Sequence, residues 1–419
     1  MASTLDRKGH MSNVSFYVGV DLGNQKHAIC VLDPQRRLVK STFVANDERL
    51  LDVVMAAIGT AAPAGVHVAL EDRNNVVVDA LLARGFAVFT ANPKQVDRFR
   101  DRETVAGAKD DRRDASVLAN ALATDERFFQ RVAVQSEFEV ELGSLAATLN
   151  ELDEDHRRIA NRLRAVVLRF FPALLSLCPG TDEKWFWALL LLLGDADAAK
   201  AVQQTDIVKL LKMHRKQVVK VEHVAAIVGA RHLATGPGVK EACRNHVAIL
   251  VKQLLALEEQ RAHATAARDA VLERLMAAEP DSTPSDVAIL RSMPGVGPKT
   301  VTSLVCECLP LLKSGDLERV RALSGVAPVT KQSGKGRRVT MRYACNPRLR
   351  FALFHVATNA IRSAGRLKDK YAKLREKGHN HARALRAVAD LVLHILRAML
   401  KDRTTYYVND VAPVVAATA

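Results

Sequence analysis

The chain has 419 residues, of which 48% are hydrophobic, and it carries a formal net charge of +15 at pH 7. This length exceeds that of one ordinary hydrophobic core and predicts two or three domains. The excess of positive charge favours a polyanionic partner, most often nucleic acid.

Several classes of protein are excluded at this stage. No apolar run approaches the roughly 20 residues of a membrane-spanning helix, and the N-terminus lacks the apolar core of a secretory signal. We therefore expect an intracellular protein with no membrane partner. The six cysteines lack the spacing of zinc sites, so we expect reduced and mostly buried thiols at Cys30, Cys178, Cys243, Cys306, Cys308 and Cys345.

The N-terminal region alternates short apolar runs with turn residues, which predicts strands. Three strands are expected first, followed by a helix, a strand, a second helix, a strand and a final helical part that ends with a helix through Leu122. This β-β-β-α-β-α-β-α order is typical of ribonuclease-H-like (RuvC-like) nuclease domains. We assign residues 11–135 to such an α/β domain.

Carboxylates stand at the ends of the predicted strands and open the last helix. Asp21 ends the first strand and Glu71 ends the fourth, and these two strands are neighbours in the ribonuclease-H-like order. Helical spacing brings Asp114 onto one face with either Asp110 or Asp111 and does not choose between them. Acids gathered without a cation repel each other, so the set predicts a site for Mg²⁺, with two ions possible. Taken singly, each acid also fits a turn, a strand end or a helix cap.

The middle region, residues 136–285, is predicted to be helical. Apolar residues at three- and four-residue intervals predict two long helices, over 137–171 and 240–278, as in a coiled-coil arm used for spacing and oligomerisation. Residues 181–238 between them are expected to be helical but irregular. A solvated face and a contact with RNA or DNA both remain open for their basic residues, which are Lys209, Lys212, His214, Arg215, Lys216 and Lys220.

The C-terminal region, residues 286–408, is predicted to be mostly α-helical. Residues 290–300 resemble the helix-hairpin-helix signature of non-specific DNA binders, in which glycines permit a tight turn before a helix N-terminus that can hold a phosphate. A segment without any acid follows, from Val329 to Arg350. The residues expected to contact nucleic acid are Lys299, Lys331, Lys335, Arg337, Arg338, Arg342 and Arg348.

Ser333 lies in this basic segment beside Gly334, and Gly336 follows closely. Glycine lets the backbone approach a ligand, so one interpretation is a flexible phosphate-binding loop. The other is a serine nucleophile that attacks phosphorus, with the cations neutralising the transition state. The segment itself supplies no base.

These motifs together resemble the DEDD-type insertion-sequence transposases, the bridge-RNA-guided serine recombinases of bacterial mobile elements. The resemblance covers most of the chain and departs from the family pattern after Glu71 and after Ser333–Gly334. The matching segments are 17–21, 68–71, 92–93, 109–115, 161–164, 171–172, 293–297, 323–328 and 333–334.

The resemblance implies a set of roles for these residues. Mg²⁺ would be held by Asp21, Glu71, Asp111 and Asp114, which leaves Asp110 as a cap or bystander. Ser333 would attack a DNA phosphodiester and form a phosphoserine, with its base supplied by the carboxylate cluster of another subunit.

The resemblance also implies partners. A guide (bridge) RNA would pair with donor and target DNA, and the protein would be a homo-oligomer, either a dimer or a tetramer. We expect a bacterial, cytoplasmic, nucleoid-associated DNA recombinase. The alternatives are a Holliday-junction-type nuclease that uses the carboxylates alone and a non-catalytic nucleic-acid-binding scaffold.

Overall fold

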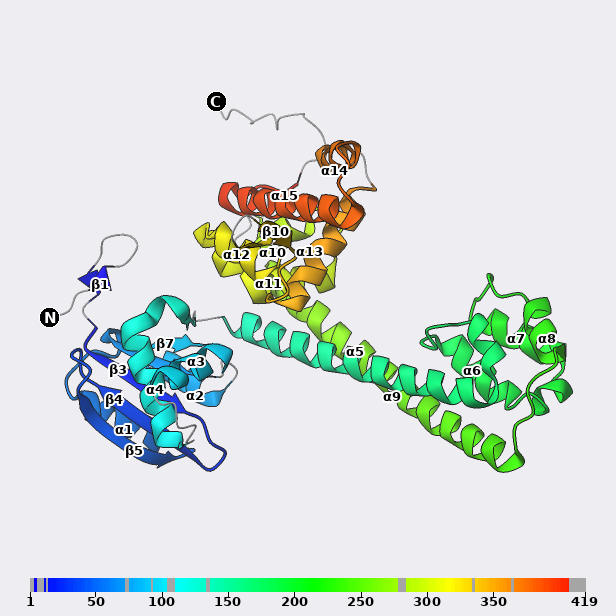
Figure 1. The fold of residues 1–419 in the computed structure, drawn as a ribbon, viewed down its shortest axis with the longest axis horizontal. Coiled ribbons are helices and arrows are strands. Elements are labelled where there is room, and N and C mark those ends of the chain that lie inside the picture. Colours follow the sequence, from blue (N-terminus) through cyan, green and yellow to red (C-terminus); the bar gives the residue numbers. More distant parts are fainter. Residues whose placement is uncertain are drawn as a thin grey trace. The chain divides into compact units, whose positions relative to one another are not determined.

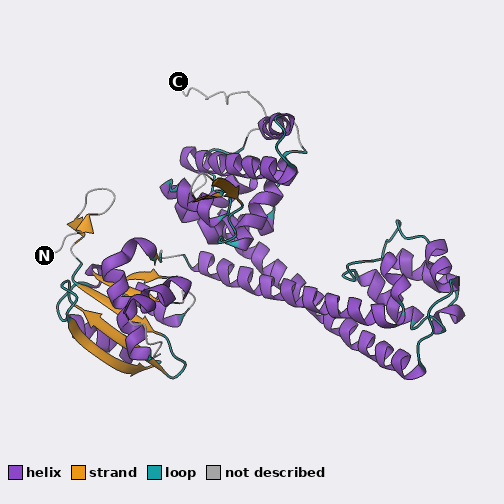
Figure 2. Cartoon of the chain, viewed as in Figure 1, coloured by secondary structure: helices purple, strands orange, loops and turns teal. Residues whose placement is uncertain are grey.

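The computed structural model describes residues 4–5, 11–12, 14–71, 75–91, 93–103, 110–132, 136–277, 284–333, 336–362 and 365–406. The chain divides into two compact units, residues 1–134 and 135–419, and each is described by itself (Figure 1). The first unit is mixed α/β and the second is largely helical (Figure 2). Within the described residues, no helix is long and apolar enough to cross a membrane.

The first unit is built on a six-stranded mixed sheet of order β5-β4-β3-β6-β7-β8. Strands β3 and β6 are parallel, as are β6 and β7, and the remaining neighbours are antiparallel. The strands are β3 (Phe16–Asp21), β4 (Lys26–Leu32), β5 (Leu38–Ala45), β6 (Val66–Leu70), β7 (Ala87–Thr90) and β8 (Gln130–Arg131). The predicted strand order is confirmed, and β8 is an addition that the sequence did not reveal. A two-stranded pair, β1 (Thr4–Leu5) and β2 (Met11–Ser12), precedes the sheet.

Helices cover both faces of this sheet, because alternate residues of each strand point to opposite sides. In β3, Val18 and Val20 belong to the core under α1 (Arg49–Ile58) and α2 (Val76–Ala83). Tyr17 belongs to the core under α3 (Pro93–Glu103) and α4 (Asp111–Asp125). This layering is consistent with a ribonuclease-H-like domain.

The second unit contains two long helices that pack along each other, α5 (Glu137–Phe170) at its start and α9 (Pro237–Ala277) further along the chain. Ser136 and Glu139 form a capping box that starts α5. Between the long helices lie α6 (Lys184–Leu193), α7 (Gln204–Met213) and α8 (Val221–Gly229). These three surround a core that contains Trp187 and Phe186, and we call residues 181–238 the head.

The C-terminal part packs on the other ends of α5 and α9, since Leu142 and Val271 belong to its core. It contains α10 (Asp286–Arg291), α11 (Pro298–Ser314), α12 (Leu317–Leu323), α13 (Pro347–Ala360), α14 (Arg366–Glu376) and α15 (His381–Asp402). One interpretation is corrected here. The basic segment, for which a flexible loop was one interpretation, forms an antiparallel hairpin, β9 (Val329–Ser333) and β10 (Gly336–Thr340). Four of the six cysteines, Cys30, Cys178, Cys243 and Cys308, are buried, as expected.

Candidate active site

Two of the predicted acids end neighbouring parallel strands. The register of β3 with β6 pairs Gly19 with Ala69, so Asp21 and Glu71, each two residues further on, emerge at the same edge of the sheet. Residues two apart on a strand share a face, which places both acids on the face that α4 covers. Both are partly exposed.

Gly19 brings α4 unusually close to the sheet. A Cβ atom at Gly19 would lie 1.9 Å from the backbone oxygen of Ala115 and 2.7 Å from the backbone nitrogen of Ala119. The backbone of α4 therefore occupies the space of a side chain on β3. Since Ala115 directly follows Asp114, this contact fixes the first turn of α4 against the strand that ends at Asp21.

The first turn of α4 separates the three aspartates that the sequence left ambiguous. Asp110 is the N-cap, and its side chain accepts a hydrogen bond from the backbone N–H of Arg112 at 3.4 Å. Asp111 is exposed at the first helical position, whereas Asp114 is only 3% exposed. The capping role of Asp110 is confirmed, and Asp114 is the buried acid. Lys109, which precedes them, lies outside the described residues.

Arg100 of α3 joins the acids. Its Nε donates to Asp114 Oδ1 at 2.7 Å, and its guanidinium pairs with Glu71 at 3.8 Å and with Asp97 at 2.9 Å. The hydrogen bond with Asp114 raises the pKa of Arg100. Sequence reasoning missed this residue, because nothing local in Asp97–Arg100 indicates a partner fourteen positions away.

These contacts allow a test of whether the residues suit a divalent cation. Carboxylate oxygens are the ligands that Mg²⁺ prefers, and Glu71 and Asp114 already share one cation, the Arg100 guanidinium. In this conformation, however, the described residues contain no group of three or more His, Cys, Asp or Glu side chains arranged to hold a metal ion. The donor chemistry fits, and Arg100 joins two of the predicted ligands, Glu71 and Asp114.

Ser333 lies in the other unit, at the end of β9. It is the register partner of Gly336, so β9 and β10 are joined across Gly334 and Lys335, which lie outside the described residues. Lys331 is opposite Arg338, and Gln332 is opposite Arg337. The serine is thus the last residue of a strand in a basic hairpin.

Several of the predicted nucleic-acid contacts are held by the protein's own groups. Arg348 pairs with Glu307 at 2.6 Å, and Arg342 Nε donates to the carbonyl oxygen of Ala327 at 3.3 Å. Arg338, on β10, is exposed. Among the predicted contacts whose side chains the structure describes, Arg338 is therefore the one that is exposed and has no such partner.

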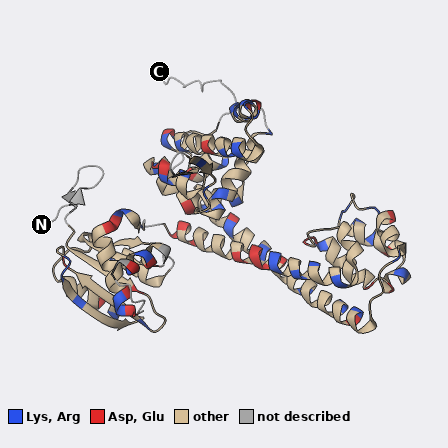
Figure 3. Cartoon of the chain, viewed as in Figure 1, with Lys and Arg blue, Asp and Glu red and all other residues tan. Residues whose placement is uncertain are grey.

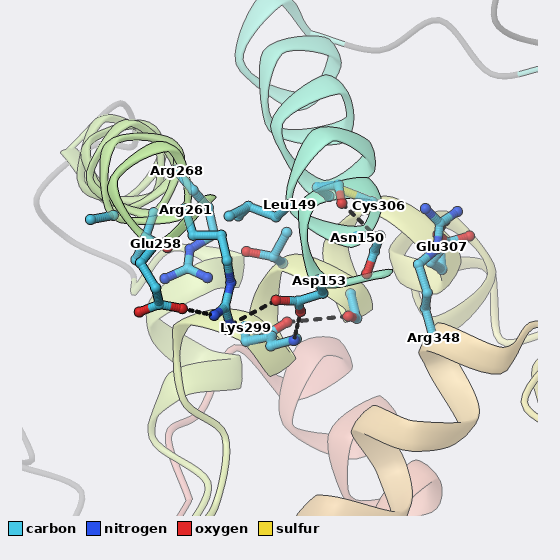
Figure 4. A pocket seen from close by; sticks show the side chains of 15 residues that line it. Leu149, Asn150, Asp153, Glu258, Arg261, Arg268, Lys299, Cys306, Glu307 and Arg348 are labelled. Carbon is cyan, nitrogen blue, oxygen red and sulfur yellow. Dashed lines mark hydrogen bonds and ion pairs between the residues drawn. The ribbon is translucent and has the colours of Figure 1, made fainter. Parts of the chain in front are cut away.

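The predicted hairpin before α11 is present as a turn between α10 and α11. Gly295 has a φ of +87°, a conformation that favours glycine, and α11 starts at Pro298. Lys299 follows, and its Nζ is bonded to Asp153 of α5 at 2.7 Å. Figure 4 shows this pair at a pocket of about 330 Å³ where α5, α9 and α11 meet.

Comparison with known families identifies the class of protein. Residues 18–172 match the IS110-type DEDD transposase family, described as "Transposase", and residues 287–372 match the family described as "Transposase IS116/IS110/IS902 family". The protein is therefore an enzyme, a transposase with a catalytic DEDD domain, and such a domain uses divalent metal. As a transposase, it acts on DNA.

Individual relatives agree with this class. A putative transposase (y4uE) of Sinorhizobium fredii is 38% identical over 203 residues, which cover 48% of this chain and 56% of the relative. The "Mini-circle putative transposase for IS117" of Streptomyces coelicolor is 26% identical, with 93% and 95% covered. A protein of insertion element IS900 of Mycobacterium paratuberculosis is 27% identical, with 93% and 97% covered. The chain belongs to the IS110/IS116/IS902 family of DEDD transposases.

Proposed function

We propose that this transposase cuts and joins DNA through a phosphoserine formed on Ser333, with Mg²⁺ held by Asp21, Glu71, Asp111 and Asp114. The observation that carries the metal part is the cation that Glu71 and Asp114 share in Arg100. Two acids from different elements can therefore bind one positive charge. The serine part is supported by the place of Ser333 at the end of a strand in an acid-free hairpin.

The chemistry assigns a task to each group of residues. The Ser333 hydroxyl oxygen bonds to phosphorus while the bond from phosphorus to one deoxyribose oxygen breaks; the serine proton passes to a carboxylate, and the departing oxygen takes up a proton. Lys331, Lys335 and Arg337 balance the charge that develops on the phosphoryl oxygens. Mg²⁺, when bound, supplies Lewis-acid activation of the attacking oxygen. Rejoining is the reverse attack by a second DNA end.

The decisive experiment is Ser333→Ala on a DNA substrate carrying the element's junction. We expect the wild-type protein to leave a covalent protein–DNA adduct, and the variant to lose both the adduct and strand cleavage. Ser314→Ala is the matched control, since Ser314 is an exposed serine of α11 in the same unit. Cleavage that persists in Ser333→Ala would assign cutting to the carboxylates alone, as in a structure-selective nuclease.

The carboxylates are tested separately. Glu71→Gln and Asp114→Asn keep the size of each side chain and remove its charge, and we expect both to abolish transposition in cells. Unchanged activity in Glu71→Gln would leave the acids with a purely structural role. Mixing Ser333→Ala with Asp114→Asn subunits tests action across subunits, because activity restored by mixing requires that different chains supply the two groups.

We further propose that a guide RNA encoded beside the gene pairs with donor and target DNA, while the basic side chains bind its backbone and that of the DNA. Sequencing of RNA that copurifies with the protein tests this, and an absence of RNA from the flanking DNA contradicts it.

The assembly is proposed to be a dimer or tetramer formed through α5 and α9, whose exposed Leu168, Ile249 and Leu255 offer apolar surface. Light scattering measures its mass. The division into parts 11–135, 136–285 and 286–408 remains a proposal for limited proteolysis to test.

A further inference from the structure

The loop between α7 and α8 concentrates positive charge in the head. Between positions 209 and 220 the chain carries five Lys or Arg residues and no acid (Figure 3). We propose that residues 212–220, which comprise the last two residues of α7 and the loop that follows and which we call the basic loop, bind the phosphodiester backbone of a nucleic acid. The proposal concerns binding alone and is independent of the chemistry at Ser333.

The acids of the head are largely occupied by other cations. Asp195 pairs with Arg244, Asp197 with Lys200 and Lys240, and Asp206 with Lys209. In contrast, no described carboxylate pairs with Lys212, Arg215 or Lys220, and all three are exposed. Three positive charges therefore face solvent without an ion-pair partner among the described residues, which attracts a polyanion.

The loop is held in a defined shape. Lys216 lies over the Trp185 ring at 5.3 Å and is also paired with Glu183, so it attaches the loop to the start of α6. The backbone N–H groups of Arg215 and Lys216 donate to the carbonyl oxygens of Lys212 and Leu211. These bonds end α7 and fix the loop, which reduces the entropy lost when a ligand binds.

Arg215 occupies a strained position. Its φ is +50°, in the left-handed region that non-glycine residues rarely adopt because the Cβ approaches the following carbonyl oxygen. Glycine or asparagine would relieve this strain at the end of α7. The backbone strain at Arg215 is therefore typical of a residue that serves binding rather than stability.

The exposed cations surround a hollow rather than a flat surface. Its volume is about 610 Å³. Its lining includes the apolar Val208 and Leu211 together with Lys212, Arg215 and Lys220, and Glu222 is the one acid in it. A hollow with a basic lining and no aromatic lining residue suits phosphate contacts that do not depend on sequence.

Salt dependence of binding by the full-length protein tests the proposal. The loop variant Lys212→Gln/Arg215→Gln/Lys220→Gln is compared with Lys184→Gln/Lys200→Gln/Lys209→Gln, which changes the charge equally at lysines that already have acidic partners. We expect the loop variant to lose affinity about tenfold or more, and its slope of log K against log salt to become shallower by about 2 to 3. The control should change little.

A local readout on the wild-type protein keeps the test independent of folding in the variants. Lysine acetylation is measured by mass spectrometry with and without a random-sequence DNA duplex or an RNA hairpin of equal length. Lys212 and Lys220 should be protected, and Lys209 should not. Protection by DNA, by RNA or by both supports the proposal and identifies the source of the phosphates. Unprotected Lys212 and Lys220 with both probes would overturn it.

Discussion

Lys299 Nζ donates a hydrogen bond to Asp153 Oδ2 over 2.7 Å and joins the start of α11 to α5. Arg261 of α9 pairs with the same carboxylate at 2.8 Å, so three helices meet at one acid (Figure 4). Burial opposes ionisation of Asp153, but the hydrogen bond and charge of Lys299 and the charge of Arg261 outweigh it and hold its pKa below the usual value.

Asp153→Asn should therefore destabilise the protein near neutral pH, by about 1 kcal/mol because the groups are partly exposed to solvent. A carboxyl whose pKa is lowered by folding stabilises the folded state above its unfolded pKa of about 3.9, and this contribution is lost as the pH falls through the folded pKa. The difference in unfolding temperature between variant and wild type should thus shrink below about pH 4. Circular dichroism melts across this range measure it.

Asp155→Asn is the control, since Asp155 is partly exposed and pairs only with Arg158, one turn away on the same helix, among the ion pairs of the described residues. It should lower the unfolding temperature less than Asp153→Asn does. A loss in Asp153→Asn that stays constant down to acid pH would contradict the proposed role of the pair.

Gly19→Ala should disrupt the candidate active site. The new Cβ would meet the backbone of Ala115 at 1.9 Å, and backbone cannot move aside as a flexible side chain can, so α4 must shift away from β3. We expect a loss of about 3 kcal/mol together with loss of transposition. Gly143→Ala in α5 meets nothing within 4 Å and should stabilise its helix by about 0.5–1 kcal/mol. Denaturant unfolding and a transposition assay compare the two; equal stability in both variants would refute the close packing.

Arg100→Gln should make the fold more dependent on Mg²⁺. Without the guanidinium, the buried Asp114 loses its charged partner, at a cost of about 1–3 kcal/mol in metal-free buffer. Bound Mg²⁺ restores stability, by about 2.7 kcal/mol at a hundred times its Kd. The rise in unfolding temperature on adding Mg²⁺ should therefore be larger in Arg100→Gln than in wild type. Arg98→Gln, at an exposed position of the same helix, should respond as wild type does, and an identical response in Arg100→Gln would exclude a shared site.

The sequence predicted the strands of the first unit because their apolar runs are buried on both faces, as in β3 and β6. The two long helices, α5 and α9, were also predicted, since their apolar residues recur at helical spacing over many turns. The hairpin β9–β10 was missed because its strands, VTKQS and GRRVT, have no apolar face to alternate with a polar one. Helix α14 was missed for a similar reason, with Leu367 as its buried residue.

The sequence indicated the acidic residues of the candidate site but gave no sign of Arg100, the cation that pairs with two of them. Asp21 and Glu71 follow apolar runs, and Asp114 stands at helical spacing from Asp111, so each has a local signal. Arg100 reaches Asp114 only because α3 packs against α4, and no local sequence pattern specifies this packing. The choice of Asp110 as the cap was likewise settled by backbone geometry, because helical spacing alone allowed two assignments.

The ion pairs of Arg100 bear on whether this domain folds before or after it binds a metal ion. A small zinc domain folds only when its ion binds, whereas here the guanidinium of Arg100 already pairs with Glu71 and Asp114 and offsets part of their negative charge. The sheet edge can therefore assemble on a newly made chain when divalent cations are scarce, and acquire its ion afterwards. A chelator should then inhibit transposition reversibly without unfolding the protein.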